Sequence, residues 1–196
     1  MPGNDSLRVG GFVPFTTIDY PGELAAVVFL QGCPWRCSYC HNTHLQPVHS
    51  SESLSWRSVL GLLKQRQGLL DAVVFSGGEP TSQRVLRDAM LEVKALGFKL
   101  GLHTAGIHPE RLQHLLPLLD WAGLDIKDLP ERYSDLTGVP GSGEKAWHSL
   151  LLLRESGVPF QVRTTLYPGL PQERLWRLEE RLREHGVADH CLQPCR

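Results

Sequence analysis

The chain has 196 residues, of which 41% are hydrophobic, and its formal net charge at pH 7 is -1. This length predicts one domain over residues 1–196, with residues 1–20 as an N-terminal extension and a core from about 21 to 193. The near-neutral charge disfavours nucleic acid as a partner, no apolar run has the roughly 18 residues of a membrane helix, and the N-terminus lacks the apolar region of a secretory signal. We therefore expect a cytoplasmic protein that binds neither nucleic acid nor membrane.

Short apolar runs alternate with amphipathic segments along the chain. The runs predict strands at residues 25–30, 71–75, 98–103, 121–126 and 159–166, and a weaker one at 190–193. The amphipathic segments predict helices at residues 56–65, 85–96, 111–119, 145–155 and 173–185. Residues 1–20 and 127–144 look irregular, and we expect the second segment to be a mobile loop beside the functional site.

The alternation of strands and helices predicts a parallel α/β sheet. About six β/α units fit into the chain, whereas a closed eightfold barrel takes about 250 residues. We therefore expect a partial (β/α)6 TIM-like barrel, with a doubly wound sheet as the alternative. In either fold, the functional site lies at the C-terminal ends of the strands.

Three of the five cysteines lie within eight residues, directly after the first predicted strand. In a reducing cytosol, this spacing of Cys33, Cys37 and Cys40 is more consistent with a metal site than with disulfides. Thiolates are the usual ligands of a [4Fe–4S] cluster, and three of them leave one iron open for another ligand. We therefore predict that the three cysteines bind a [4Fe–4S] cluster. A structural zinc site, with His41 or His44 as the fourth ligand, is the alternative.

The spacing CxxxCxxC, with an aromatic residue, Tyr39, directly before the last cysteine, resembles the signature of the radical S-adenosylmethionine (SAM) superfamily. This resemblance implies a partial barrel of the radical SAM type. It also implies that the open iron binds the amino and carboxylate groups of SAM. The reduced cluster then cleaves SAM to methionine and a 5′-deoxyadenosyl radical, which abstracts a hydrogen atom.

Motifs at the next two strand ends fit this resemblance. Gly77, Gly78 and Glu79 begin a Gly-Gly-Glu-Pro segment similar to the motif that contacts the SAM amino group, although a plain turn before a helix is the alternative interpretation. His103 and Thr104 end the third predicted strand, where their polar groups could meet the SAM ribose or an ion.

The comparison with glycyl-radical enzyme activating enzymes extends to the later strands. These enzymes often have aspartate where this chain has His103, which leaves open whether a monovalent cation binds near Asp125. Asp125 and Lys127 point the same way by strand alternation, and segment 124–138 resembles the pattern in which the lysine approaches SAM. Arg163 corresponds to an arginine that serves the SAM carboxylate. A surface ion pair and a buried structural arginine, respectively, are the alternatives.

The segment before the first predicted strand narrows the resemblance. Residues 9–22 (VGGFVPFTTIDYPG) and the later Phe29-x-x-Gly32-Cys33 look like anaerobic ribonucleoside-triphosphate reductase activating proteins. The resemblance covers about residues 8 to 193. It implies an activase, reduced by flavodoxin or ferredoxin, that generates a glycyl radical on a partner, with anaerobic ribonucleotide reductase as the expected partner. No catalytic residue beyond the cluster and SAM is expected, because the cofactor carries the chemistry.

Three alternatives compete with this prediction. They are a radical SAM enzyme acting on a small molecule, such as a 7-carboxy-7-deazaguanine synthase, a non-catalytic zinc-binding module, and an inactive paralogue that serves as a scaffold. The remaining cysteines, Cys191 and Cys195, are too few for a second cluster. We expect them to be buried or free thiols, with a redox pair as the weaker alternative.

Overall fold

The computed structural model describes residues 7–195. Seven strands form one sheet in the order β1-β2-β3-β4-β5-β6-β7. The strands are β1 (Val9–Thr16), β2 (Ala25–Leu30), β3 (Ala72–Gly77), β4 (Lys99–Thr104), β5 (Trp121–Asp125), β6 (Phe160–Leu166) and β7 (His190–Pro194). Neighbouring strands from β2 to β7 are parallel, whereas β1 is antiparallel to β2.

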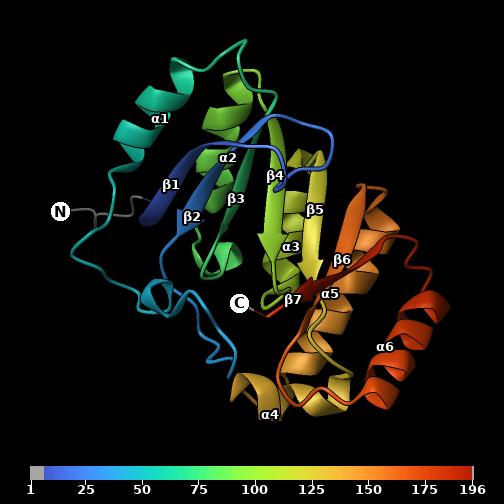
Figure 1. Ribbon diagram of the computed structural model, residues 1–196. Helices are drawn as coiled ribbons and strands as arrows, with labels where there is room; N and C mark the ends of the chain where they lie inside the picture. The colour runs from blue at the N-terminus through green and yellow to red at the C-terminus, as the bar shows by residue number, and fades with distance from the viewer. Residues whose placement is uncertain (1–6, 196) are drawn as a thin grey trace.

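Helices connect the parallel strands and cover the outside of the sheet (Figure 1). The α-helices are α1 (Trp56–Lys64), α2 (Leu86–Ala95), α3 (Pro109–Leu115), α4 (Tyr133–Thr137), α5 (Ser142–Ser156) and α6 (Gln172–Glu184). Four short 3-10 helices are η1 (Thr43–Leu45), η2 (Pro80–Ser82), η3 (Leu116–Leu118) and η4 (Pro130–Arg132). None of the helices within residues 7–195 combines the length and hydropathy that spanning a lipid bilayer requires.

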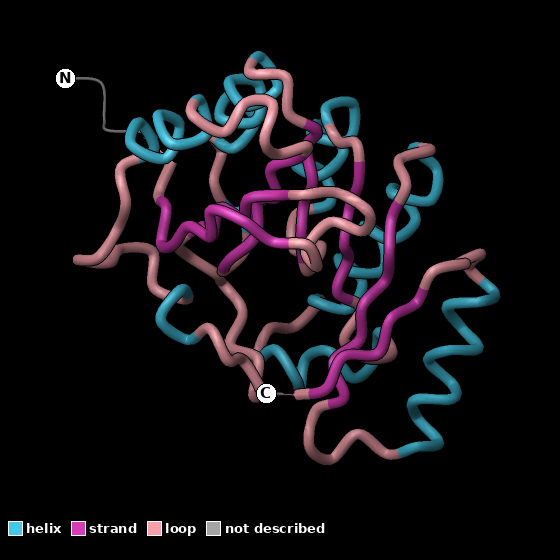
Figure 2. Tube along the Cα trace, turned by 45° about the horizontal axis from the view of Figure 1, so that its top comes forward, coloured by secondary structure: helices cyan, strands magenta, loops and turns pink. Residues whose placement is uncertain are grey.

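Strand alternation gives the sheet two apolar faces. The outer face packs against the helices and forms the main core, whose strand residues include Ala26, Val28, Val73, Phe75, Leu100, Leu102, Leu124 and Val162. The inner face carries a smaller cluster made of Tyr20, Ala25, Val27, Ala72, Val74 and Trp121. Burial on both faces explains why these strands appear in the sequence as continuous apolar runs. Figure 2 shows the helices, in cyan, around the strands, in magenta.

All six predicted strands are confirmed, and β2 has the predicted limits. The expectation that residues 1–20 are irregular is wrong for the described part of that segment, because β1 pairs with β2. Two irregularities, between Val9 and Gly11 and between Val13 and Thr16, interrupt the register of β1. A strand with such bulges loses the strict alternation by which strands are found in a sequence.

The expectation that residues 127–144 are irregular is also wrong, because the segment contains η4, α4 and the first turn of α5. Helix α4 has five residues, which is too short for a helical period to be visible in the sequence. The carbonyls of Leu136 and Thr137 accept hydrogen bonds from the backbone N–H groups of Ser38 and Arg36. The segment therefore supports the cysteine loop.

The sheet is open rather than closed. β1 and β7 lie at opposite ends of the strand order and do not pair with each other within the described residues. Because β2 to β7 are parallel, their C-terminal ends lie at one end of the sheet. The loop after β2 and helix α4 lie at the end to which the arrowheads of β4 and β5 point (Figure 1).

Candidate functional site

A cavity of about 160 Å³ opens at the C-terminal ends of the parallel strands. The sequence-predicted residues that line it are Cys33, Cys37, Tyr39, Cys40, Gly77, Gly78, His103, Thr104, Asp125 and Lys127. These residues come from the loop after β2 and from the ends of β3, β4 and β5. The fold thus brings together ten of the twelve predicted residues, whereas Glu79 and Arg163 lie outside the lining.

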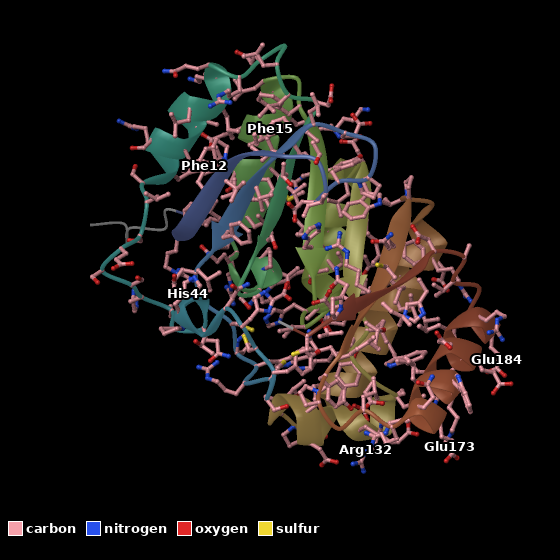
Figure 3. All side chains as sticks on the ribbon, in the orientation of Figure 1. Phe12, Phe15, His44, Arg132, Glu173 and Glu184 are labelled. Carbon is pink, nitrogen blue, oxygen red and sulfur yellow. The ribbon has the colours of Figure 1, made fainter. Side chains whose placement is uncertain are left out.

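The cysteine loop, residues 33–40, is fixed at both ends and in the middle by backbone hydrogen bonds. At its start, the N–H groups of Gly32 and Cys33 donate to the carbonyls of Leu45 and Gln46. Its middle is bound to α4 as described above, and the N–H of Cys40 donates to the carbonyl of Cys37. Figure 3 shows sulfur atoms, in yellow, on this segment, with His44 on the neighbouring η1. The loop therefore has a defined course although it has almost no regular secondary structure.

The three thiols are half-buried, and burial opposes the ionisation of Cys33 and Cys37. Desolvation, and secondarily the nearby Glu79 carboxylate, raise the pKa of Cys33 to about 12. Desolvation also raises the pKa of Cys37, against the opposing effect of the Lys127 ammonium. The thiols of Cys33 and Cys37 are therefore protonated unless an electrophile such as iron displaces their protons.

The geometry fits a cluster better than a single metal ion. Between residues 7 and 195, no group of three or more His, Cys, Asp or Glu side chains is gathered around a point that could hold a metal ion. A structural zinc site needs four donors around one ion. A cuboidal cluster instead takes each thiolate at a different iron, so the ligand sulfurs need not meet at one point. The donor set of three thiols on one cavity wall therefore fits a [4Fe–4S] cluster.

The two glycines at the end of β3, Gly77 and Gly78, allow the backbone to pack closely against the start of the cysteine loop. A Cβ atom on Gly77 would lie 2.2 Å from the N atom of Leu30, and one on Gly78 would lie 2.6 Å from the O atom of Gly32. The N–H of Gly78 donates to the carbonyl of Leu30, and that of Glu79 donates to the carbonyl of Gly32. In this structure, the absence of a side chain thus serves the contact between the β3 end and the β2 end.

Glu79 is fully buried and joins the ends of two strands. Its Oε1 atom accepts hydrogen bonds from Thr81 N, Thr81 Oγ1 and Thr104 Oγ1 at 3.0, 2.6 and 2.7 Å, and its Oε2 atom accepts one from Ala105 N at 2.9 Å. Burial raises the pKa of Glu79, while these four donors oppose the rise. The carboxylate therefore holds the β4 end against the turn after β3 rather than facing the cavity.

Asp125 and Lys127 lie on the cavity wall as an ion pair. Lys127 Nζ is 3.2 Å from Asp125 Oδ2 and 5.5 Å from the centre of the Tyr39 ring. Burial disfavours the charged lysine, but Tyr39, Asp125 and Cys37 outweigh this effect and raise the pKa of Lys127 well above its usual value. With a side chain only 11% exposed, Lys127 is not a surface lysine. It places a stable positive charge beside the cysteine loop.

His103 and Arg163 interact on the inner face of the barrel. Arg163 Nη1 lies 3.2 Å from His103 Nδ1, and His103 Nε2 lies 2.7 Å from the carbonyl oxygen of Asp19. The Arg163 guanidinium also lies over the Trp121 ring, 5.2 Å from its centre. A Cβ atom on Gly123 would lie 2.9 Å from the guanidinium carbon, so this glycine leaves the room for Arg163 to cross β5. Arg163 thus points toward β4 and the start of β5, and contacts the lining residue His103 without lining the cavity itself.

Sequence analysis missed several residues that line the cavity. They include Trp35, Asn42, Gln46, Ser76, Ala105, Thr165 and Gln193. Ser76, Thr165 and Gln193 belong to β3, β6 and β7, and a polar residue near the C-terminal end of each strand was the signal that could have identified them. A separate cavity of about 970 Å³, lined mainly by residues 7–8, residues 48–57 and α1, contains none of the predicted site residues.

The structure also shows where the last two cysteines lie relative to each other. Cys191 lies in β7, in register with Arg163, and Cys195 directly follows the strand. Four residues of extended chain separate Cα atoms by roughly 13 Å, whereas a disulfide requires less than about 7 Å. The redox pair considered from the sequence is therefore incompatible with this conformation.

Comparisons with known proteins point to the same superfamily as the cysteine motif at the site. The sequence model of the radical SAM superfamily matches residues 27–183. The chain is 34% identical over 176 residues to a candidate glycyl-radical enzyme activating enzyme of Methanocaldococcus jannaschii, covering 84% of this chain and 70% of that protein. It is 31% identical over 173 residues to the pyruvate formate-lyase-activating enzyme of Clostridium pasteurianum, covering 85% of this chain and 71% of that protein.

Solved structures confirm the partial barrel. SuiB of Streptococcus suis bound to S-adenosylmethionine has a TM-score of 0.68 at 16% identity, over 85% of this chain and 39% of that chain. The enzyme anSMEcpe with bound AdoMet has a TM-score of 0.69 at 16% identity, over 85% of this chain and 49% of that chain. The chain thus spans less than half of these two structures. The chain belongs to the radical SAM superfamily and, within it, to the family of glycyl-radical enzyme activating enzymes.

Proposed function

We propose that this protein reductively cleaves SAM at a [4Fe–4S] cluster held by Cys33, Cys37 and Cys40, and thereby generates a glycyl radical on a partner enzyme. The observation that supports this proposal most strongly is the shared cavity, in which the three thiols face polar groups from the ends of neighbouring strands. The radical SAM superfamily uses this pair of cofactors. When bound, they supply one electron and an organic radical that removes a hydrogen atom.

The chain's own residues would bind and orient these groups. We propose that Tyr39, Gly77, Gly78, His103 and Thr104 line the SAM side of the site. Gly77, Gly78 and Thr104 bring the ends of β3 and β4 into the same cavity lining as the cysteines.

Lys127 and Asp125 would complete the polar wall. Lys127 carries a stable positive charge beside the cysteine loop, which favours bound anionic groups such as thiolates and a carboxylate. For Glu79 and Arg163 we propose supporting roles, because each is hydrogen-bonded to the wall from outside the cavity. No acid or base is needed for a hydrogen-atom transfer, so we assign no general acid–base residue.

The partner that we propose is an anaerobic ribonucleotide reductase, with flavodoxin or ferredoxin as the electron donor in the cytoplasm. The basis for this partner is the N-terminal segment that ends in Tyr20-Pro21-Gly22. The curated relatives include pyruvate formate-lyase-activating enzymes, so pyruvate formate-lyase is the partner to compare. An open barrel suits a polypeptide substrate, because the unpaired edges of the sheet leave a side through which a loop can enter.

Anaerobic reconstitution with iron and sulfide, followed by SAM and dithionite, tests the first half of the proposal. We expect 5′-deoxyadenosine to appear on chromatography even without a partner. Co-incubation with an anaerobic ribonucleotide reductase, and separately with pyruvate formate-lyase, tests the second half by electron paramagnetic resonance (EPR) of the glycyl radical. Deoxyadenosine without a glycyl radical on either enzyme would contradict the proposed partners and point to another substrate.

A further inference from the structure

The ring of Tyr39, which lies between two proposed cluster ligands, stacks on the ring of Tyr167. The two ring centres are 5.3 Å apart and the ring planes differ by 3°. Tyr167 directly follows β6, in the turn before α6, and sequence analysis assigned it no role. The β2 loop and the β6–α6 loop lie at the same end of the sheet (Figure 1). This contact therefore connects the cysteine loop to a distant part of the chain.

Tyr167 is itself anchored by a buried carboxylate. Its hydroxyl donates to Asp128 Oδ2 at 2.5 Å, and Arg174 Nη1, on α6, donates to the same oxygen at 3.0 Å. Asp128 is fully buried, and its Oδ1 atom accepts a hydrogen bond from Leu129 N. Desolvation and the hydrogen bond to Asp128 raise the pKa of Tyr167, so the hydroxyl keeps its proton and remains a donor. Arg174 Nη1 also donates to the Tyr167 hydroxyl at 3.3 Å, so two hydrogen bonds hold the outer end of the ring.

Tyr39 lacks an anchor of this kind. Its hydroxyl oxygen is buried and makes no hydrogen bond of good geometry within residues 7–195, although it interacts weakly with the Lys127 side chain. The contacts that orient the ring are the stack on Tyr167 and the nearby Lys127 ammonium. Lys127 and Asp128 are neighbours in the chain, so the same turn after β5 holds Tyr39 directly through Lys127 and indirectly through Tyr167.

We propose that Tyr167 is a positioning residue for the iron–sulfur cluster, because its ring fixes Tyr39 and thereby the neighbouring ligands Cys37 and Cys40. The inference rests on the proposed function in that these cysteines are taken as cluster ligands. It adds a residue from the β6–α6 turn, and the Asp128–Arg174 pair behind it, to the parts of the chain that determine cluster retention.

A double-mutant cycle on the anaerobically reconstituted protein tests this role. The rate of iron release to an added chelator is measured for wild type, Tyr39→Leu, Tyr167→Leu and the double variant. We expect each single variant to release iron roughly two- to tenfold faster, the range that the coupling of an aromatic pair allows. In the Tyr39→Leu background, Tyr167→Leu should add little, and the EPR signal of the reduced cluster should broaden in both single variants.

Tyr20→Leu is the matched control. It removes a similar ring contact, since Tyr20 and Trp121 have ring centres 5.2 Å apart, in the inner-face cluster that contains no cavity residue. Its iron release should equal that of wild type.

Tyr167→Phe keeps the ring but not the hydrogen bond to Asp128, so it should release iron about two- to threefold faster, with a narrower EPR signal than Tyr167→Leu. If Tyr167→Leu does not fold, Tyr167→Met is measured in its place, because it also removes the stacked ring, and a wild-type rate of iron release by that folded variant overturns the proposal.

The outcomes separate this inference from the proposed function. If Tyr167→Leu releases iron like the wild type, or if its effect simply adds to that of Tyr39→Leu, Tyr167 does not act through Tyr39 and the inference is wrong, whatever the partner. If the wild type holds a cluster and the cycle behaves as expected, but no glycyl radical forms on a partner, the inference stands and the proposed function fails.

Discussion

Arg163 and His103 lie against each other on the inner face of the barrel, with Arg163 Nη1 3.2 Å from His103 Nδ1. The Asp19 carbonyl lies 2.7 Å from Nε2. A neutral imidazole with its hydrogen on Nε2 donates to the carbonyl and accepts from Arg163 Nη1 at Nδ1, while Arg163 Nη2, which lies 2.9 Å from Nε2, finds no acceptor there. Burial, and secondarily the Arg163 charge, lower the pKa of His103 to about 4.

This arrangement makes stability depend on pH. In the unfolded chain, His103 has an ordinary pKa near 6.5. Between pH 6.5 and pH 4, His103 is therefore protonated in the unfolded chain and neutral in the folded chain. The His103 contribution is therefore complete above pH 6.5 and is lost as the pH falls toward 4, by about 2 kcal/mol between pH 7.5 and pH 5. Urea unfolding at the two pH values measures this loss, and it should shrink in His103→Gln, which keeps a donor and an acceptor.

The comparison between wild type and His103→Gln is needed because His108 and His190 also have lowered pKa values. Their contributions are the same in both proteins and cancel in the difference. Asp19 and Asp125 also act on His103, in the direction opposite to Arg163. Equal losses of stability in the two proteins would mean that His103 is protonated in the fold.

The five cysteines should separate into two classes. Changing any one of Cys33, Cys37 or Cys40 to Ala should reduce 5′-deoxyadenosine formation below detection, because a cluster with two protein ligands is not retained in a catalytic state. Cys191→Ala and Cys195→Ala should retain most of the activity. Iron content and chromatography of the reaction products measure both effects, and turnover by Cys37→Ala would contradict the ligand assignment.

Removal of the Glu79 carboxylate should cost stability. Glu79→Ala leaves two threonine hydroxyls and two backbone N–H groups without their acceptor in a fully buried position. We expect a loss of about 3 to 5 kcal/mol in the free energy of unfolding. Glu92→Ala, which removes an exposed carboxylate with a single bond from Trp56 Nε1, should cost less than about 1 kcal/mol. Urea titrations measure both, and equal losses would refute the buried role.

Two glycine substitutions should have opposite effects. Gly78→Ala would place a Cβ atom 2.6 Å from Gly32 O and 2.7 Å from Leu45 O, where only backbone could move, so we expect a loss of about 1 to 3 kcal/mol and a displaced cysteine loop. Gly61→Ala lies inside α1 with no atom within 4 Å of the added Cβ, and should stabilise the protein by about 0.5 to 1 kcal/mol. Thermal unfolding distinguishes the two, and a stabilising Gly78→Ala would show that the loop can move aside.

Much of the fold was predictable because its strands are buried on both faces and therefore appear as apolar runs. β2 illustrates this, since its run AAVVFL has the limits of the strand. The sequence did not predict β1, because bulges break the alternation of polar and apolar residues along it. It did not predict α4 either, because five residues are too few to show a helical period. Both missed elements are held mainly by partners far away in the chain, such as β2 for β1 and the cysteine loop for α4.

The sequence by itself determined the chemistry: three thiols at fixed spacing after a strand, and polar motifs at the ends of the strands that follow. Only the tertiary structure decided which groups meet. It turned Glu79 inward to Thr104 and Ala105, directed Arg163 across Gly123 to His103, and brought Tyr167 onto Tyr39. Local patterns report how a segment is buried, whereas the partner of a side chain depends on strand order and register, which arise from the packing of the whole sheet.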